Sequence, residues 1–262
     1  MEMINIKKYN FTRKDRKTGK ISNCGFMNLD TSANRASLYF YGDICGSAWQ
    51  SEWYADDKAP QDVADFLSEL GNSTKPLDVF VNSCGGDVFG GIAIYNILKR
   101  YQGEKTAHID GIAASIAGII PFACDRVIAP KSAQIMLHKP WSYCSGNADD
   151  MRKCIESLDM CEKSIIDIYL HHVVNGTTEE EIKSMIDRET WLTCEEASKY
   201  FNIEIEDSEP VSAYISDYFT NYRHIPENLK LSKDSPEIHD KKRKLQLEND
   251  LLRLRNEVKK YD

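Results

Sequence analysis

Short β-rich segments alternate with helical segments through the first half of the chain, and this alternation is the strongest constraint on its fold. The β-rich segments are bounded by Gly, Pro or polar residues, and the spacing of Val63, Phe66 and Leu70 is helical. Such alternation is typical of an α/β domain with a mostly parallel sheet. In chain order, the expected elements are strand 36–42, helix 60–70, strand 77–82, helix 92–101, strand 106–109, helix 113–124, and strands 126–129 and 133–137.

A longer helical pattern follows at 147–174, where apolar residues are spaced by three and four and Asn175-Gly176 ends the run. We therefore expect three parts. Residues 1–35 form an N-terminal extension, with residues 1–21 either extended or folded as a hairpin. Residues 36–205 form the α/β domain, and residues 206–262 form a C-terminal extension that ends in a charged helix.

Charge, hydropathy and cysteine spacing exclude several classes of protein. A net charge of −8 is a poor match for nucleic-acid binding, which needs a basic face. No apolar run approaches the ~18 residues of a membrane span, and the first residues show no secretory signal. The eight cysteines form no Cys-x-x-Cys pair, so neither a metal site nor a disulfide framework is predicted. These features predict a cytoplasmic protein without a membrane or nucleic-acid partner.

Four segments carry residues capable of chemistry. Gly85-Gly86 follows a predicted strand, Ser115 lies among small residues, His138 ends an apolar strand, and several acids lie in 187–196. Each has an ordinary structural explanation by itself: a tight turn, a packing residue or N-cap, a structural histidine, and surface charge. A serine becomes a nucleophile at neutral pH only beside a base, and histidine is the usual one.

The order of these segments resembles the proteolytic subunit of Clp proteases, the ClpP family of serine peptidases. The resemblance covers roughly residues 36–205 and is greatest to the ClpP-like proteases of prophages that act in head maturation. It implies a ClpP/crotonase-like α/β fold of repeated β-β-α units with a protruding long helix. The motifs that carry it are Asn-Ser-Cys-Gly-Gly at 82–86, with Cys84 in the family's proline place, Ala-Ala-Ser at 113–115, Met-Leu-His-Lys-Pro at 136–140 and Trp-Leu-Thr-Cys-Glu-Glu-Ala at 191–197.

The resemblance implies roles for individual residues. Ser115 is expected to be the nucleophile and His138 the general base. The backbone N–H groups of Gly86 and Ile116 are expected to form the oxyanion hole. An ungapped alignment on the 191–197 motif puts Glu189 in the place of the family's aspartate. Asp187, which is the nearby aspartate, remains the other candidate for the third member of the triad. No cofactor is implied.

The resemblance also implies partners. The substrate is expected to be an extended polypeptide, bound between the segment after Gly86 and residues 143–147. The family implies heptameric rings that stack through the helix at 147–174, with Ile165, Ile168 and Tyr169 buried between subunits. Unfolded or capsid-associated proteins are the expected substrates. A separate AAA+ unfoldase or phage capsid proteins are the expected partners.

Two other functions remain open from the sequence. A crotonase-type acyl-CoA enzyme shares the superfamily and its paired N–H groups, but it does not need Ser115 together with His138. A scaffolding or interaction protein of a phage-like particle would use the charged C-terminal helix for docking. The presence of the serine and the histidine favours the peptidase.

Overall fold

The computed structural model describes residues 6–14, 21–30, 35–46, 58–71, 74–208, 222–226 and 229. The chain divides into two compact units, residues 1–224 and residues 225–262. The second unit is described at 225–226 and 229, where the Leu229 N–H donates to the Pro226 carbonyl. The boundary predicted at 205/206 stays a prediction, and the helix predicted at 241–260 lies outside the described residues.

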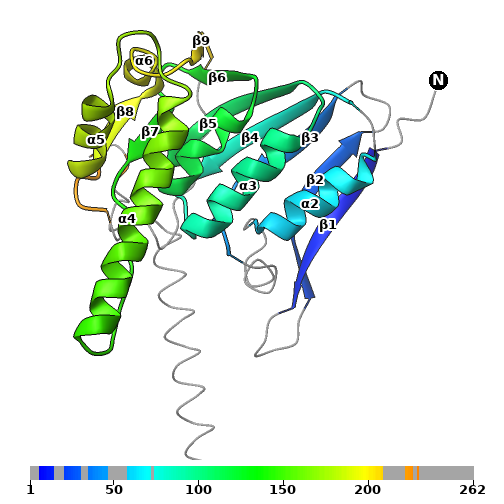
Figure 1. Ribbon diagram of the computed structural model, residues 1–262. Coiled ribbons are helices and arrows are strands. Elements are labelled where there is room, and N and C mark those ends of the chain that lie inside the picture. Colours follow the sequence, from blue (N-terminus) through cyan, green and yellow to red (C-terminus); the bar gives the residue numbers. More distant parts are fainter. Residues whose placement is uncertain are drawn as a thin grey trace, which may run out of the picture. The chain divides into compact units, whose positions relative to one another are not determined.

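A mostly parallel sheet forms the centre of the first unit (Figure 1). Five parallel strands follow one another in the order β3-β4-β5-β6-β9. The end of β5 also pairs in parallel with β7, which pairs antiparallel with β8. The predicted α/β class is therefore confirmed. The strands are β3 (Ala36–Phe40), β4 (Leu77–Ser83), β5 (Lys105–Ala114), β6 (Arg126–Pro130), β7 (Gln134–Leu137), β8 (Thr190–Thr193) and β9 (Glu204–Glu206).

Buried residues alternate with partly exposed ones along the first two strands of the sheet, as expected for strands with one buried face. Two helices cover that face. Alternate residues of β3 and β4, such as Leu38 and Val79, are fully buried. Helices α2 (Pro60–Glu69) and α3 (Val88–Arg100) lie side by side over the sheet in Figure 1. Helix α3 begins at Asp87, whose carboxylate accepts a hydrogen bond from the Gly90 N–H at 2.6 Å.

The helix predicted at 113–124 is wrong. Strand β5 continues to Ala114, and two short 3-10 helices follow, η1 (Ser115–Ile119) and η2 (Pro121–Ala123). Residues 112–114 pair with 134–136 of β7, and this pairing extends the strand. The pairing of β5 with β7 therefore outweighs the intrinsic preference of the alanines in this segment for helix. As a result, Ser115 lies at a strand end.

The long helix α4 (Ala148–Leu170) matches the predicted helix but ends four residues before Val174. Its first half projects beyond the sheet, and its second half packs on the domain (Figure 1). Ile165 and Tyr169 lie in the core of their own chain, with exposed fractions of 7% and 1%. Ile168 is half-buried and packs against the same core. Of the three residues predicted to be buried between subunits, the prediction is therefore wrong for Ile165 and Tyr169. The exposed apolar residues lie on the projecting half, where Ile155 is 58% exposed.

The remaining elements surround this core. Strands β1 (Ile6–Lys14) and β2 (Ile21–Asp30) pair antiparallel, so the hairpin expected for the N-terminal residues is confirmed, although its turn lies outside the described residues. Helix α5 (Glu179–Asp187) has Thr178 as its N-cap, whose hydroxyl accepts from the Glu181 N–H. The last helix of the domain is α6 (Cys194–Ala197).

Candidate active site

Ser115 lies where β5 ends and η1 begins, with its backbone in the left-handed region at a φ of 55°. Such a conformation costs a non-glycine residue about 1 kcal/mol or more, and it persists where the surrounding structure imposes it. The pairing of β5 with β7 holds Ala114 opposite Met136, so the residue before the serine is fixed. The strand end therefore determines where the Ser115 hydroxyl lies.

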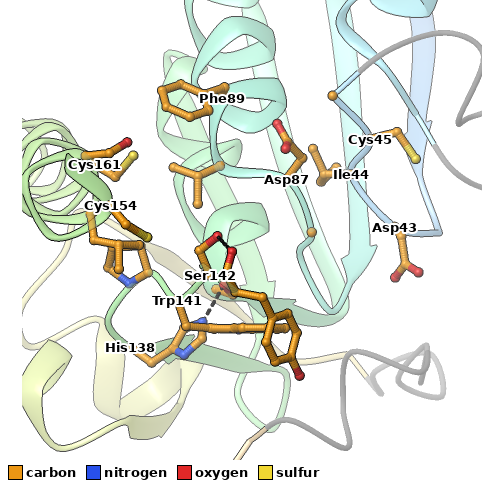
Figure 2. A pocket seen from close by; sticks show the side chains of 18 of the residues that line it. Asp43, Ile44, Cys45, Asp87, Phe89, His138, Trp141, Ser142, Cys154 and Cys161 are labelled. Atoms are coloured by element: carbon orange, nitrogen blue, oxygen red, sulfur yellow. Dashed lines mark hydrogen bonds between the residues drawn. The ribbon is translucent and has the colours of Figure 1, made fainter. Parts of the chain in front are cut away.

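His138 follows the last residue of β7, directly beside the serine turn. Because β5 and β7 are parallel, their carboxyl ends lie at the same edge of the sheet. The Ser115 Oγ and the His138 Nε2 are 2.6 Å apart and form a hydrogen bond (Figure 2). The structure thus brings together the two residues that the sequence predicted as nucleophile and base.

The environment of His138 favours its neutral form. Burial lowers the pKa of His138 below its ordinary value, and the negative charge of Glu189 opposes this by raising it. A neutral imidazole accepts a proton at Nε2, whereas an imidazolium does not. At neutral pH, His138 is consequently in the protonation state that a general base needs.

The Gly85-Gly86 turn lies against the serine and has no room for side chains. The φ of Gly85 is +97°, and a Cβ on it would lie 2.8 Å from the Ala114 carbonyl oxygen. A Cβ on Gly86 would lie 2.1 Å from the Ile44 carbonyl oxygen. Ile44 holds the turn, since its N–H donates to Gly85 and its carbonyl accepts from Asp87. The strand–glycine signal in the sequence therefore reports a close backbone approach to the nucleophile.

The two candidate acids lie in different environments. Asp187 is exposed and pairs with Lys139, with 2.8 Å between its Oδ1 and the lysine Nζ. Glu189 is half-buried and also has a left-handed backbone, with a φ of 52°. Its Oε1 accepts the backbone N–H groups of Arg223 at 2.5 Å and His224 at 2.7 Å. Within the described part of the chain no carboxylate hydrogen-bonds to His138, so Glu189 acts on that ring through its charge.

Tyr222 is a residue of the site that the sequence interpretation missed. It is buried, its phenol donates to the Cys84 carbonyl, and its ring packs edge-on against His138 at 5.2 Å between centroids. Burial raises the pKa of Tyr222, and a hydrogen bond with Ser115 partly offsets this. Tyr222 lies beyond the segment that carries the family resemblance. The only signal was the aromatic content of the polar stretch 207–227.

A cavity of about 480 Å³ opens beside the serine. In Figure 2, Cys154 and Cys161 of α4 form one wall, Phe89 lies above, and His138 and Trp141 lie below. Its lining includes 87–89, which follow Gly86, and 140–143. Of the segment 143–147, where the sequence predicted one side of the substrate site, Tyr143 lines the cavity. Ile116, the other predicted oxyanion donor, lines a small adjoining pocket with Ser115 and His138.

The described residues contain no group of three or more His, Cys, Asp or Glu side chains placed to hold a metal ion. None of the described helices is both long and apolar enough to span a membrane.

Comparison with known proteins gives one consistent family. The family model described as Clp protease matches residues 54–204. The ATP-dependent Clp protease proteolytic subunit 1 of Chlamydia abortus is 32% identical over 136 residues, which are 50% of this chain and 70% of that protein. The ATP-dependent Clp protease proteolytic subunit of Bacteroides fragilis is 28% identical over 133 residues, which are 50% of this chain and 63% of that protein.

A solved structure shows a similar fold. A mutant of ClpP1 from Listeria monocytogenes superposes with a TM-score of 0.53 and 23% sequence identity, covering 65% of this chain and 91% of that one. Tyr222 lies outside the family match, 18 residues after its last position at 204.

Proposed function

The chain belongs to the Clp protease family of peptidases, and from this premise we propose that it is a serine endopeptidase acting on unfolded or capsid-associated proteins. The observation that carries the proposal is the 2.6 Å hydrogen bond between Ser115 and His138 at the mouth of a cavity. Neither a crotonase-type enzyme nor a scaffolding protein needs this pair. The pair therefore favours hydrolysis over both alternatives.

In the proposed reaction, the Ser115 Oγ attacks the substrate carbonyl carbon while its proton passes to the His138 Nε2. The carbonyl π electrons move to the oxygen, and the N–H groups of Gly86 and Ile116 stabilise the resulting oxyanion. One such donor contributes about 3 kcal/mol to the transition state. The carbonyl then re-forms as the C–N bond breaks, and His138 gives its proton to the leaving amine. Water next attacks the acyl carbon while His138 takes its proton, and the C–O bond to Ser115 breaks as His138 returns that proton to the Ser115 Oγ.

We assign Glu189 as the acid of the catalytic triad, the residue that orients His138 and stabilises its protonated form. Its negative charge raises the pKa of His138, as an acid that stabilises an imidazolium must. Asp187 is a weaker candidate, because its carboxylate forms an exposed ion pair with Lys139. Glu189 also has a strained backbone, and strain of this kind clusters at functional sites.

We also propose a ring assembly, in which the projecting half of α4 contacts a second copy and the sites face an interior chamber. Support comes from large apolar side chains exposed there, including Met151 and Ile155 at 38% and 58%. In such a ring the substrate enters as an unfolded chain, supplied by a separate AAA+ unfoldase or by a phage capsid.

The assembly is tested by sedimentation of an Ile155→Glu variant. The added charge is expected to split the assembly while leaving the protomer folded, because the position is exposed in the protomer. Lys153→Glu, at an exposed position on the same helix, is the matched control. A native chain that sediments as a fully active monomer at micromolar concentration would contradict the proposal.

The activity is tested with a fluorophosphonate probe, which labels activated serines covalently. The native chain is expected to be labelled and Ser115→Ala is not. Ser164→Ala, which removes an exposed hydroxyl on α4, is the control and should label like the native chain. Labelling that survives Ser115→Ala would refute the assignment.

A further inference from the structure

Residues 222–224 lie against the catalytic pair although they follow the family segment in sequence. They belong to the same compact unit as Ser115 and His138. Tyr222 also lines the cavity that contains the serine. We refer to Tyr222–His224 below as the strap.

The strap contacts the candidate active site through the side chain of Tyr222. The Tyr222 ring lies edge-on between His138, at 5.2 Å, and Trp191, at 5.7 Å. Edge-on aromatic pairs at such distances are stabilising beyond the area that they bury. The phenol donates to the carbonyl of Cys84, the residue before the paired glycines. The Tyr222 ring therefore packs against aromatic side chains of the site, and its hydroxyl is hydrogen-bonded to a backbone carbonyl there.

The strap also contacts the site through its main chain. Consecutive N–H groups, those of Arg223 and His224, donate to one oxygen of Glu189. Hydrogen bonds to an ionised acceptor are roughly twice as strong as neutral ones. Main-chain hydrogen bonds combined with a side chain among aromatic rings are contacts that protein sites also use to recognise peptides.

From these contacts we infer that Cys84, Trp191, His138 and Glu189 form a peptide-binding subsite for an aromatic, hydroxyl-bearing residue followed by two main-chain N–H groups. Its occupant in this structure is the strap of the same chain. The inference rests on the proposed peptidase function, because the strap then competes with the substrate polypeptide for the site. A substrate that presents a tyrosine followed by two free N–H groups replaces the strap most effectively.

Occupation of the subsite has a consequence for Glu189. While Oε1 of Glu189 accepts the two strap N–H groups, its carboxylate makes no hydrogen bond to His138. Departure of the strap frees the carboxylate to orient the imidazole. Displacement of the strap and completion of the triad are therefore the same event.

The first test measures hydrolysis of an unfolded protein by the full-length chain. Tyr222→Ala removes the ring and the phenol of the strap, and kcat/KM is expected to rise about tenfold, since a competing occupant lowers apparent affinity by the fraction of open sites. A fall in kcat/KM at an unchanged melting temperature would overturn the inference, because Tyr222 would then support catalysis.

A second pair of variants covers the case in which Tyr222→Ala fails to fold. Arg223→Pro removes one N–H donor to Glu189, whereas Arg223→Ala keeps that donor and loses the same side chain. The inference requires faster hydrolysis by Arg223→Pro than by Arg223→Ala. Equal rates in the two variants would overturn it.

The last test measures binding without turnover. A fluorescent peptide with the sequence of residues 222–226 is titrated into full-length Ser115→Ala chains with and without Tyr222→Ala. Binding is expected to be about tenfold tighter where the strap lacks its tyrosine, and a peptide carrying Tyr222→Ala itself should bind at least tenfold more weakly. Equal affinities would overturn the subsite, whereas absence of probe labelling in chains that retain Ser115, both native and Tyr222→Ala, would overturn only the peptidase function.

Discussion

The Ser115–His138 pair and Glu189 are positioned by different kinds of contact. Ser115 and His138 follow neighbouring parallel strands, and the register of β5 with β7 determines their separation. Glu189 lies in the turn between α5 and β8, and its carboxylate is bound by backbone groups more than thirty positions further along the chain. The proposed nucleophile and base are therefore positioned by the sheet, whereas the carboxylate of the proposed acid is held by a distant segment of the chain.

The largest loss of activity is expected from removing the Ser115 hydroxyl, which the sheet positions. Ser115→Ala should lower peptide hydrolysis by about 10⁶-fold, as loss of a nucleophile does in comparable triads. The fold should persist, because the change removes one half-buried hydroxyl. Hydrolysis assays with circular dichroism as the folding control measure both effects. Undiminished turnover would place the nucleophile elsewhere.

A smaller effect is expected from the acid. Glu189→Gln should lower kcat by about 10³- to 10⁴-fold, because a neutral amide does not stabilise an imidazolium. Asp187→Asn breaks only an exposed ion pair with Lys139, which contributes at most about 1 kcal/mol to stability. Turnover of the two variants, measured side by side, sharpens the contrast between the acids. If both keep full activity, the enzyme works with Ser115 and His138 alone.

The smallest effect concerns pH. The proposed mechanism needs neutral His138 as its base, so kcat/KM should fall as pH drops through the His138 pKa, which burial lowers below its ordinary value of about 6.5. Glu189→Gln removes a charge that raises this pKa, so the midpoint should move to still lower pH. Rates of probe labelling across the pH range measure it. An upward shift in Glu189→Gln would show that the acid does not act on His138.

The difference between the Ser115–His138 pair and Glu189 also explains which parts of the site the sequence predicted. The strand–Gly-Gly turn, the serine and the histidine are local signals, each within a few residues of a strand end. The sequence predicted their elements and their order along the chain. It placed Ser115 on a helix because the run of small residues around it favours helix, whereas the pairing of β5 with β7 that extends the strand is a long-range interaction.

Long-range contacts also account for what the sequence did not predict. The binding of Glu189 to the strap joins positions 34 and 35 residues apart, and no spacing rule reports it. The embedding of Ile165 and Tyr169 depends on which half of α4 meets the core, which helical periodicity alone does not determine. The predicted spacing of apolar residues along the helix was correct, but the partner predicted to cover Ile165 and Tyr169 was wrong.

The left-handed backbone at Ser115 has a consequence for how this position can change over time. Glycine adopts that conformation without the steric cost that a serine side chain carries, so selection for stability alone would favour glycine there. Only a requirement for the hydroxyl opposes that drift. In a lineage released from peptide hydrolysis, this position is where the sequence is expected to decay first, and the gain in stability would accompany the loss of function.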